Sequence, residues 1–209
     1  MALHGRFNHY DLLENWINMY NLKIISSTVR PGRKGPVVAN WIKEVAGNHG
    51  SFNVELLDLG EIKLPMMDEP NHPRLRKYQH DHTKRWSAKI DEAEIFIFVT
   101  AEYDYNYPAP LRNALEYLVH EWQFKAAGIV SYGGVSAGTR AANSLKADLS
   151  TLKMVPITES VNFPFFEHNI NDDNDFEVNE ISMKAATTML NQLVRWTKGL
   201  KIIKEYTGV

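Results

Sequence analysis

The chain of 209 residues contains no cysteine, which excludes disulfide bonds, thiolate catalysis and cysteine-ligated zinc or iron–sulfur centres. It lacks any run of about 18 apolar residues, so the sequence predicts no membrane-spanning helix. The formal net charge is only −2 at pH 7, which gives no electrostatic support for nucleic-acid binding. The hydrophobic fraction of 44% and the charged fraction of 23% are ordinary for a globular domain. We therefore expect a cytoplasmic protein.

Residues 1–18 differ in character from the rest of the chain, and we expect them to form an N-terminal appendage. Asp11 followed by Glu14 is a variant of the capping box and could open a short helix. The alternative is a poorly ordered terminus. The regular alternation of elements begins at residue 19, so we expect residues 19–209 to form a single domain.

Segments typical of strands and of helices alternate along this domain. We predict strands at 20–26, 52–59, 94–100, 126–132 and 154–163. We predict helices, from apolar residues at helical spacing, at 35–46, 83–91, 108–120, 136–150 and 175–198. Such alternation indicates an α/β fold with a parallel sheet and helices on both faces. Five strands match the flavodoxin-like doubly wound order 2-1-3-4-5.

Three loops at one edge of this sheet have an unusual composition. In this fold, ligands bind beyond the carboxyl ends of the strands, where the strand order reverses. The first loop, at 26–35, offers three hydroxyls, two glycines and three cations before a helix. Backbone N–H groups at a helix start favour an anion, and arginines bind phosphate bidentately. The spacing fits neither a Walker A sequence nor GxGxxG. The loop is thus either a phosphate site of another kind or a solvated basic turn.

The second loop carries three tyrosines, Tyr103, Tyr105 and Tyr107, after a strand that we expect to be buried. Aromatic loop residues provide flat contact area with a polar tip. They favour a ligand wall, a subunit interface or a lid over the core.

The third loop contains the pair Gly133-Gly134, which permits close approach of the backbone to a ligand. The alternative is a flexible turn before a helix that Ser136 caps. Taken together, the three loops suit a flat heteroaromatic phosphomonoester, for which FMN is the obvious candidate.

The residues of these loops resemble the NADPH-dependent FMN reductase family, the flavodoxin-like NAD(P)H quinone and azo reductases. The first loop, SSTVRPGR, is similar to the family's GSTRPGR-type phosphate loop. The second, AEYDYNYPAPLRNALEYL, is similar to its PEYN…YP…LKNALDYL segment, although Ala101 and Asp104 replace the usual Pro and Asn. The third, SYGGVSAGTRA, matches its SYGG motif, and LPMMDEP at 64–70 matches a further stretch. The resemblance covers about residues 19–163.

The resemblance implies a set of cofactor-binding residues. Ser27, Arg30 and Arg33 would bind the FMN phosphate. Glu102, Tyr103 and Asp104 would lie along the isoalloxazine ring. The full set is Ser26, Ser27, Arg30, Arg33, Glu102, Tyr103, Asp104, Asn106, Ser131, Tyr132, Gly133 and Gly134.

The resemblance also implies an activity, that of an FMN-dependent NAD(P)H oxidoreductase. NADPH or NADH would transfer a hydride to the flavin, which would then reduce a quinone, an azo dye or another flavin. No catalytic side chain or metal is expected, and His80-Asp81-His82 is interpreted as a solvated loop. The alternatives are a non-enzymatic flavodoxin-type electron carrier and an FMN-binding regulatory protein.

The resemblance finally implies a homodimer or homotetramer. Tyr105, Tyr107 and Trp122 are candidates for exposed aromatic residues at the subunit interface. Arg112 and Glu116 are spaced to form an ion pair on one helix.

Overall fold

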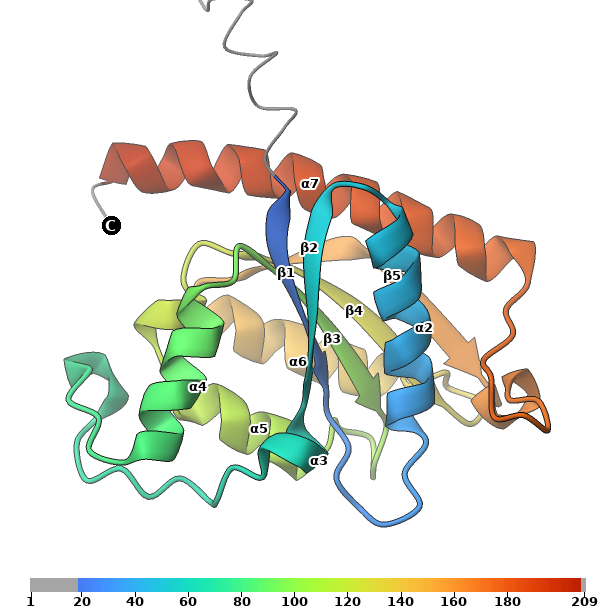
Figure 1. Cartoon of the computed structure of the whole chain (residues 1–209), viewed down its shortest axis with the longest axis horizontal. Coiled ribbons are helices and arrows are strands. Elements are labelled where there is room, and N and C mark those ends of the chain that lie inside the picture. Colours follow the sequence, from blue (N-terminus) through green and yellow to red (C-terminus); the bar gives the residue numbers. More distant parts are fainter. Residues whose placement is uncertain (1–18, 208–209) are drawn as a thin grey trace, which may run out of the picture.

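Five parallel strands form the centre of the computed structural model, which describes residues 19–207 (Figure 1). Their order is β2-β1-β3-β4-β5, and every neighbouring pair is parallel. This confirms the predicted 2-1-3-4-5 topology. Residues 1–18, and with them the expected appendage, lie outside the described residues. The strands are β1 (Tyr20–Ser26), β2 (Phe52–Asp58), β3 (Ile95–Ala101), β4 (Ala126–Gly133) and β5 (Val155–Pro164).

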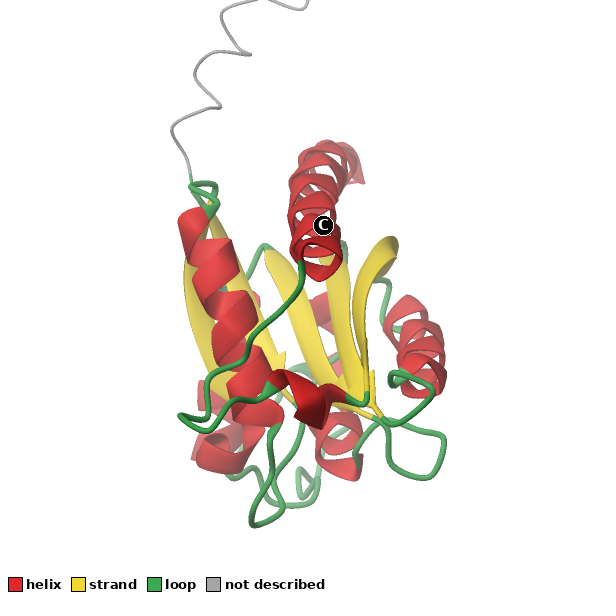
Figure 2. Ribbon diagram, turned by 90° about the vertical axis from the view of Figure 1, so that its right-hand side faces the viewer, coloured by secondary structure: helices red, strands yellow, loops and turns green. Residues whose placement is uncertain are grey.

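Helices cover both faces of the sheet (Figures 1 and 2). One face packs against α2 and α7, and the other packs against α4, α5 and α6. Among the helices of the described part, none is both long enough and apolar enough to span a bilayer. The helices are α2 (Gly35–Asn48), α3 (Leu59–Ile62), α4 (Asp81–Asp91), α5 (Ala109–Glu116), α6 (Thr139–Thr151) and α7 (Glu180–Thr207), with single 3-10 turns η1 (Pro73–Leu75), η2 (His120–Trp122) and η3 (Phe166–Asn169).

Strand β3 shows how the sequence builds this three-layer arrangement. All seven residues of IFIFVTA are buried. Side chains alternate between the two faces of a strand, so Ile95 and Ile97 join the core beneath α2 and α7. Phe96 and Phe98 join the core beneath α4, α5 and α6. A strand that is buried on both faces reads as a continuous apolar run, as parallel strands between two helical layers do.

Two of the aromatic residues expected at a subunit interface belong instead to the core beneath α4, α5 and α6. Trp122 is fully buried, and its ring centroid lies 5.1 Å from that of Phe96. Tyr107 is also buried, and its hydroxyl donates to Asp148. Both interface predictions are therefore wrong, because these rings fill the space between the sheet and its own helices. Tyr105 is 69% exposed and remains available to a partner.

Several helix boundaries differ from the predicted ones, and the largest difference is at the end of α7, which runs to Thr207 rather than to 198. Helix α6 begins at Thr139 rather than at 136, because Gly138 has a positive φ of 73° and the preceding residues form a turn. Helix α5 ends at Glu116, since the chain continues into the separate turn η2. Helix α7 begins at Glu180 because Asp175 pairs with Asn171 across a tight loop.

Candidate functional site

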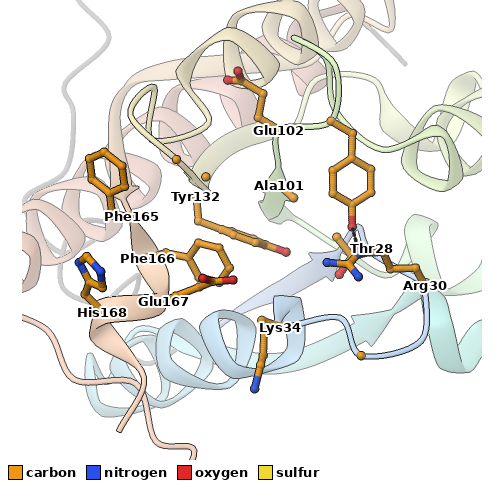
Figure 3. A pocket seen from close by; sticks show the side chains of 14 residues that line it. Thr28, Arg30, Lys34, Ala101, Glu102, Tyr132, Phe165, Phe166, Glu167 and His168 are labelled. Carbon is orange, nitrogen blue, oxygen red and sulfur yellow. Dashed lines mark hydrogen bonds between the residues drawn. The ribbon is translucent and has the colours of Figure 1, made fainter.

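A pocket of about 420 Å³ lies at the carboxyl edge of the sheet (Figure 3). It is bounded by the loops that follow β1, β3, β4 and β5. This is the edge where the strand order reverses between β1 and β3, as expected for a ligand site in such a sheet. Its volume falls within the range of about 300–1,000 Å³ that is typical of small-molecule sites. The lining residues are Thr28, Arg30, Gly32, Lys34, Ala101, Glu102, Tyr103, Tyr132, Gly133, Gly134, Phe165, Phe166, Glu167 and His168.

The β1–α2 loop forms a cationic side of the pocket. Arg30 and Lys34 both line it, and the Nε of Arg30 donates to the Tyr103 hydroxyl at 3.2 Å. Lys34 occupies the N-cap position of α2, but its side chain makes no capping hydrogen bond, and Pro36 in the first turn has no N–H. The first N–H groups of a helix need partners from outside the helix and favour an anion. The loop therefore combines side-chain cations with the start of a helix.

Gly35 brings the first turn of α2 close to buried hydroxyl groups. A Cβ at this position would lie 2.3 Å from Thr28 Oγ1 and 2.7 Å from the Tyr132 hydroxyl. The Oγ of Ser26, the Oγ1 of Thr28 and the hydroxyl of Tyr132 are all buried without a hydrogen-bond partner. Buried polar atoms normally have partners, so three orphaned hydroxyls beside one pocket point to a polar ligand group.

Tyr132 extends across the centre of the pocket in Figure 3. Burial raises the pKa of Tyr132 to about 12, and the nearby Thr28 hydroxyl only partly offsets this effect. The phenol is therefore neutral at physiological pH and able to donate a hydrogen bond. The Tyr132 ring centroid lies 4.7 Å from that of Phe166, so the ring is also held by packing.

The β3–α5 loop closes into a tight turn at the pocket wall. Tyr103 and Asn106 exchange two backbone hydrogen bonds, of 2.8 and 2.9 Å. The residues between them, Asp104 and Tyr105, have positive φ values of 48° and 68°. This is the geometry of a type I′ turn, in which both central residues are left-handed. Asp104 is exposed at the tip of this turn and does not line the pocket.

The segment after β5 forms a wall that the sequence interpretation did not include. Phe165 to His168 line the pocket opposite the Arg30 side (Figure 3). The signal was present, because an aromatic pair followed by Glu167 and His168 comes directly after the last predicted strand. We expected ligand contacts beyond the carboxyl ends of strands 1, 3 and 4, and the same expectation holds for the end of strand 5.

Six of the twelve expected cofactor-binding residues line this pocket: Arg30, Glu102, Tyr103, Tyr132, Gly133 and Gly134. The other six do not line it. Ser26 and Ser27 are buried at the end of β1, and Ser131 donates from its Oγ to the backbone carbonyl of Ala137 at 2.7 Å. Asp104 and Asn106 belong to the I′ turn.

Arg33 does not line the pocket and is engaged elsewhere. Its Nη1 lies 2.7 and 2.8 Å from the two carboxylate oxygens of Asp58, at the end of β2. Its Nη2 lies 3.4 Å from Glu61. The guanidinium is thus engaged by two acids of the neighbouring strand and helix.

The His80-Asp81-His82 segment was interpreted as a solvated loop, but the structure shows that it is the start of α4, with His80 as the N-cap. The Nε2 of His82 lies 2.9 Å from Asp68 Oδ1, and the Nε2 of His80 lies 3.2 Å from the Asp68 carbonyl oxygen. Both rings therefore anchor the long 63–80 connection. Between residues 19 and 207, no group of three histidine or acidic side chains is arranged to hold a metal ion.

A 2-1-3-4-5 parallel sheet with a polar and aromatic pocket at its β1/β3 edge defines a flavodoxin-like protein. Residues 20–168 match the family described as NADPH-dependent FMN reductase, and the chain belongs to this family. This confirms the resemblance drawn from the three loops, and with it the expectation of an FMN- and NAD(P)H-dependent reductase family.

Individual relatives agree with this assignment. The chain is 42% identical over 133 residues to an NAD(P)H-dependent FMN reductase of Schizosaccharomyces pombe, a match that covers 63% of this chain and 66% of that protein. It is 32% identical over 142 residues to an NAD(P)H-dependent FMN reductase of Saccharomyces cerevisiae, covering 63% of this chain and 74% of that one. In structure it is similar to FerB, a flavoenzyme NAD(P)H:(acceptor) oxidoreductase of Paracoccus denitrificans. The TM-score is 0.66 at 17% identity, over 87% of this chain and 98% of that chain.

Proposed function

We propose that the protein is an FMN-dependent NAD(P)H oxidoreductase whose two-electron acceptor is a small flat molecule, such as a quinone, an azo dye or a free flavin. The observation that carries this proposal is the pairing of a cationic, hydroxyl-rich corner with an aromatic wall in one pocket. The corner suits a phosphate, and the wall suits a planar ring system. An FMN molecule has both parts.

The residues present fit the phosphate end of FMN. We assign the phosphate contacts to Arg30, Lys34 and the Thr28 hydroxyl, together with the N–H groups at the start of α2. Arg30 is preferred to Arg33, because Arg33 is already engaged by Asp58.

The residues also fit the ring end. Gly133 and Gly134 allow the backbone to approach a ring edge, and Tyr103 and Phe166 offer aromatic surface. Bound FMN supplies the hydride chemistry, whereas the protein binds the ring, orients it and excludes water. No side chain needs to act as a nucleophile.

Two exposed aromatic rings support a flat acceptor. Phe165 is 53% exposed and Tyr103 is 38% exposed, and both line the pocket. A planar acceptor could stack on either ring as it approaches the flavin. The homodimer or homotetramer and the cytoplasmic location expected from the sequence remain predictions.

One preparation tests the proposal. The purified protein should be yellow or take up added FMN, and anaerobic NADPH or NADH should bleach the flavin absorbance. A protein that binds FMN but is reduced only by dithionite would be an electron carrier or a regulatory protein. A protein that takes up no FMN would exclude the assignment. Ranking quinone, azo and free-flavin acceptors by kcat/KM would then identify the acceptor class.

A further inference from the structure

Arg140, in the first turn of α6, contacts the β3–α5 loop at Glu102 and at Tyr105. Its Nη1 lies 3.0 Å from Glu102 Oε1, and its backbone N–H donates to Glu102 Oε2 at 3.3 Å. Its guanidinium carbon lies 4.0 Å from the centroid of the Tyr105 ring. A single side chain therefore holds the residue before the I′ turn and a residue inside it.

The Glu102 carboxylate depends on this contact for its charge partner. The Glu102 side chain is only 9% exposed, and in Figure 3 it points away from the centre of the pocket. Removing one member of a largely buried ion pair leaves the other charge uncompensated in a poorly solvated place. Glu102 also lines the pocket, so an uncompensated carboxylate would add negative potential there.

The backbone of the turn needs an external support as well. Asp104 and Tyr105 both adopt the left-handed region, which is unfavourable for a residue with a side chain. A guanidinium stacked on the Tyr105 ring favours this conformation. The turn begins at Tyr103, whose hydroxyl accepts the hydrogen bond from Arg30. Arg140 therefore acts, through the turn, on the side chain that orients Arg30.

We propose that Arg140 is a positioning residue of the flavin site, which holds the 102–106 turn against α6 and neutralises Glu102 beside the pocket. This inference rests on the proposed FMN site. Two-electron reduction makes a flavin more negative, so an uncompensated Glu102 would disfavour the reduced form relative to the oxidised form.

The first test needs no cofactor and uses amide hydrogen exchange of the apo protein. In Arg140→Met, the bridge amides of Tyr103 and Asn106 should exchange about tenfold faster, because the turn opens more often. The matched control is Arg195→Met, which removes an exposed arginine from α7. Exchange at Tyr103 and Asn106 that equals that of the control overturns the proposal.

The second test uses the midpoint potential of bound FMN. In Arg140→Met, the preference for reduced over oxidised FMN should fall on the order of tenfold, which is a lowering of about 30 mV for a two-electron couple. Arg140→Lys keeps the charge but loses the planar fork. It should therefore retain the wild-type potential while the turn exchanges faster.

A double variant separates charge from structure. In Glu102→Gln/Arg140→Met both charges are absent, so the potential should return towards the wild-type value. A potential that stays low in the double variant shows that Arg140 does not act by neutralising Glu102, and overturns that role. A wild-type protein that takes up no FMN overturns the proposed function itself, whereas unchanged amide exchange in Arg140→Met overturns only this inference.

Discussion

The Nη1 of Arg33, in the β1–α2 loop, lies 2.7 and 2.8 Å from the two carboxylate oxygens of Asp58 at the end of β2. Both side chains are only 14% exposed. Arg30, three residues earlier, instead faces the pocket and hydrogen-bonds Tyr103. Two arginines of one basic loop thus have different structural roles: Arg33 ties the loop to the sheet, and Arg30 lines the candidate pocket.

Arg30→Ala should raise the Kd for FMN more than tenfold, because it removes a charged phosphate contact. Arg33→Ala should change the Kd less, and should instead lower the free energy of unfolding by roughly 1–3 kcal/mol, since it leaves Asp58 without its charged donor. Fluorescence titration with FMN and urea denaturation measure the two quantities. The opposite ranking of the two Kd values would transfer the phosphate role to Arg33.

Gly35→Ala should destabilise the apo protein by about 1–3 kcal/mol and strongly weaken FMN binding, because the new methyl group would overlap the Thr28 and Tyr132 hydroxyls. Gly47→Ala is the matched control in the same helix, where a Cβ would meet no atom within 4 Å. It should stabilise the protein by up to about 1 kcal/mol. Thermal melts of both variants test the contrast, and equal shifts would contradict it.

Tyr132→Phe should separate binding from stability. The Tyr132 hydroxyl is buried without a partner, so removing it should leave the apo protein at least as stable as the wild type. If this hydroxyl serves FMN, the Kd for FMN should rise by roughly tenfold. Calorimetric melting of the apo protein and FMN titration give the two answers. A variant that is clearly less stable but binds FMN normally would show that the hydroxyl is structural.

Lys125 predicts a pH dependence of stability. It is 7% exposed, its Nζ donates to the carbonyl oxygens of Ile90 and Asp91, and burial lowers the pKa of Lys125 from 10.5 to about 8. Between these two pKa values the unfolded chain binds more protons than the folded one, so the free energy of unfolding rises with pH.

The contribution of Lys125 is measured by comparison with Lys125→Met, because the contributions of the other titrating groups to the pH dependence then cancel. The difference in unfolding free energy, wild type minus variant, should increase from pH 8 to pH 10.5 by on the order of 3 kcal/mol. Urea denaturation at several pH values within this window measures it. A difference that does not vary with pH would mean that Lys125 titrates normally in the folded protein.

The sheet could be predicted closely because its signal is local. The buried apolar run of β3 and the alternation of elements located the strands, and the predicted strands agree with the structure within one residue. The strand order followed from the match of five strands to the doubly wound arrangement. The first residues of the helices were harder to predict from the sequence. The start of α6 depends on a backbone turn that ends at Gly138, and composition alone does not reveal where such a turn ends.

The site was predicted in part for a similar reason. Arg30, Tyr103 and Tyr132 lie at or just beyond the carboxyl ends of strands that could be placed from the topology, and they meet in one pocket. The pairing of Arg33 with Asp58 spans 25 residues and could not be read from the loop. The orientation of Asp104 depends on the positive φ values of Asp104 and Tyr105. An Asn-Gly pair would have predicted this turn, whereas Asp-Tyr does not.

The turn between Tyr103 and Asn106 closes on itself through its own backbone hydrogen bonds. The two residues at its tip can therefore be replaced without altering the register of the sheet. Replacing Asp104-Tyr105 by Asn-Gly would suit the backbone better, yet it would remove the ring on which Arg140 stacks. The tip is thus a place where substitutions could alter the rim of the pocket without changing the sheet.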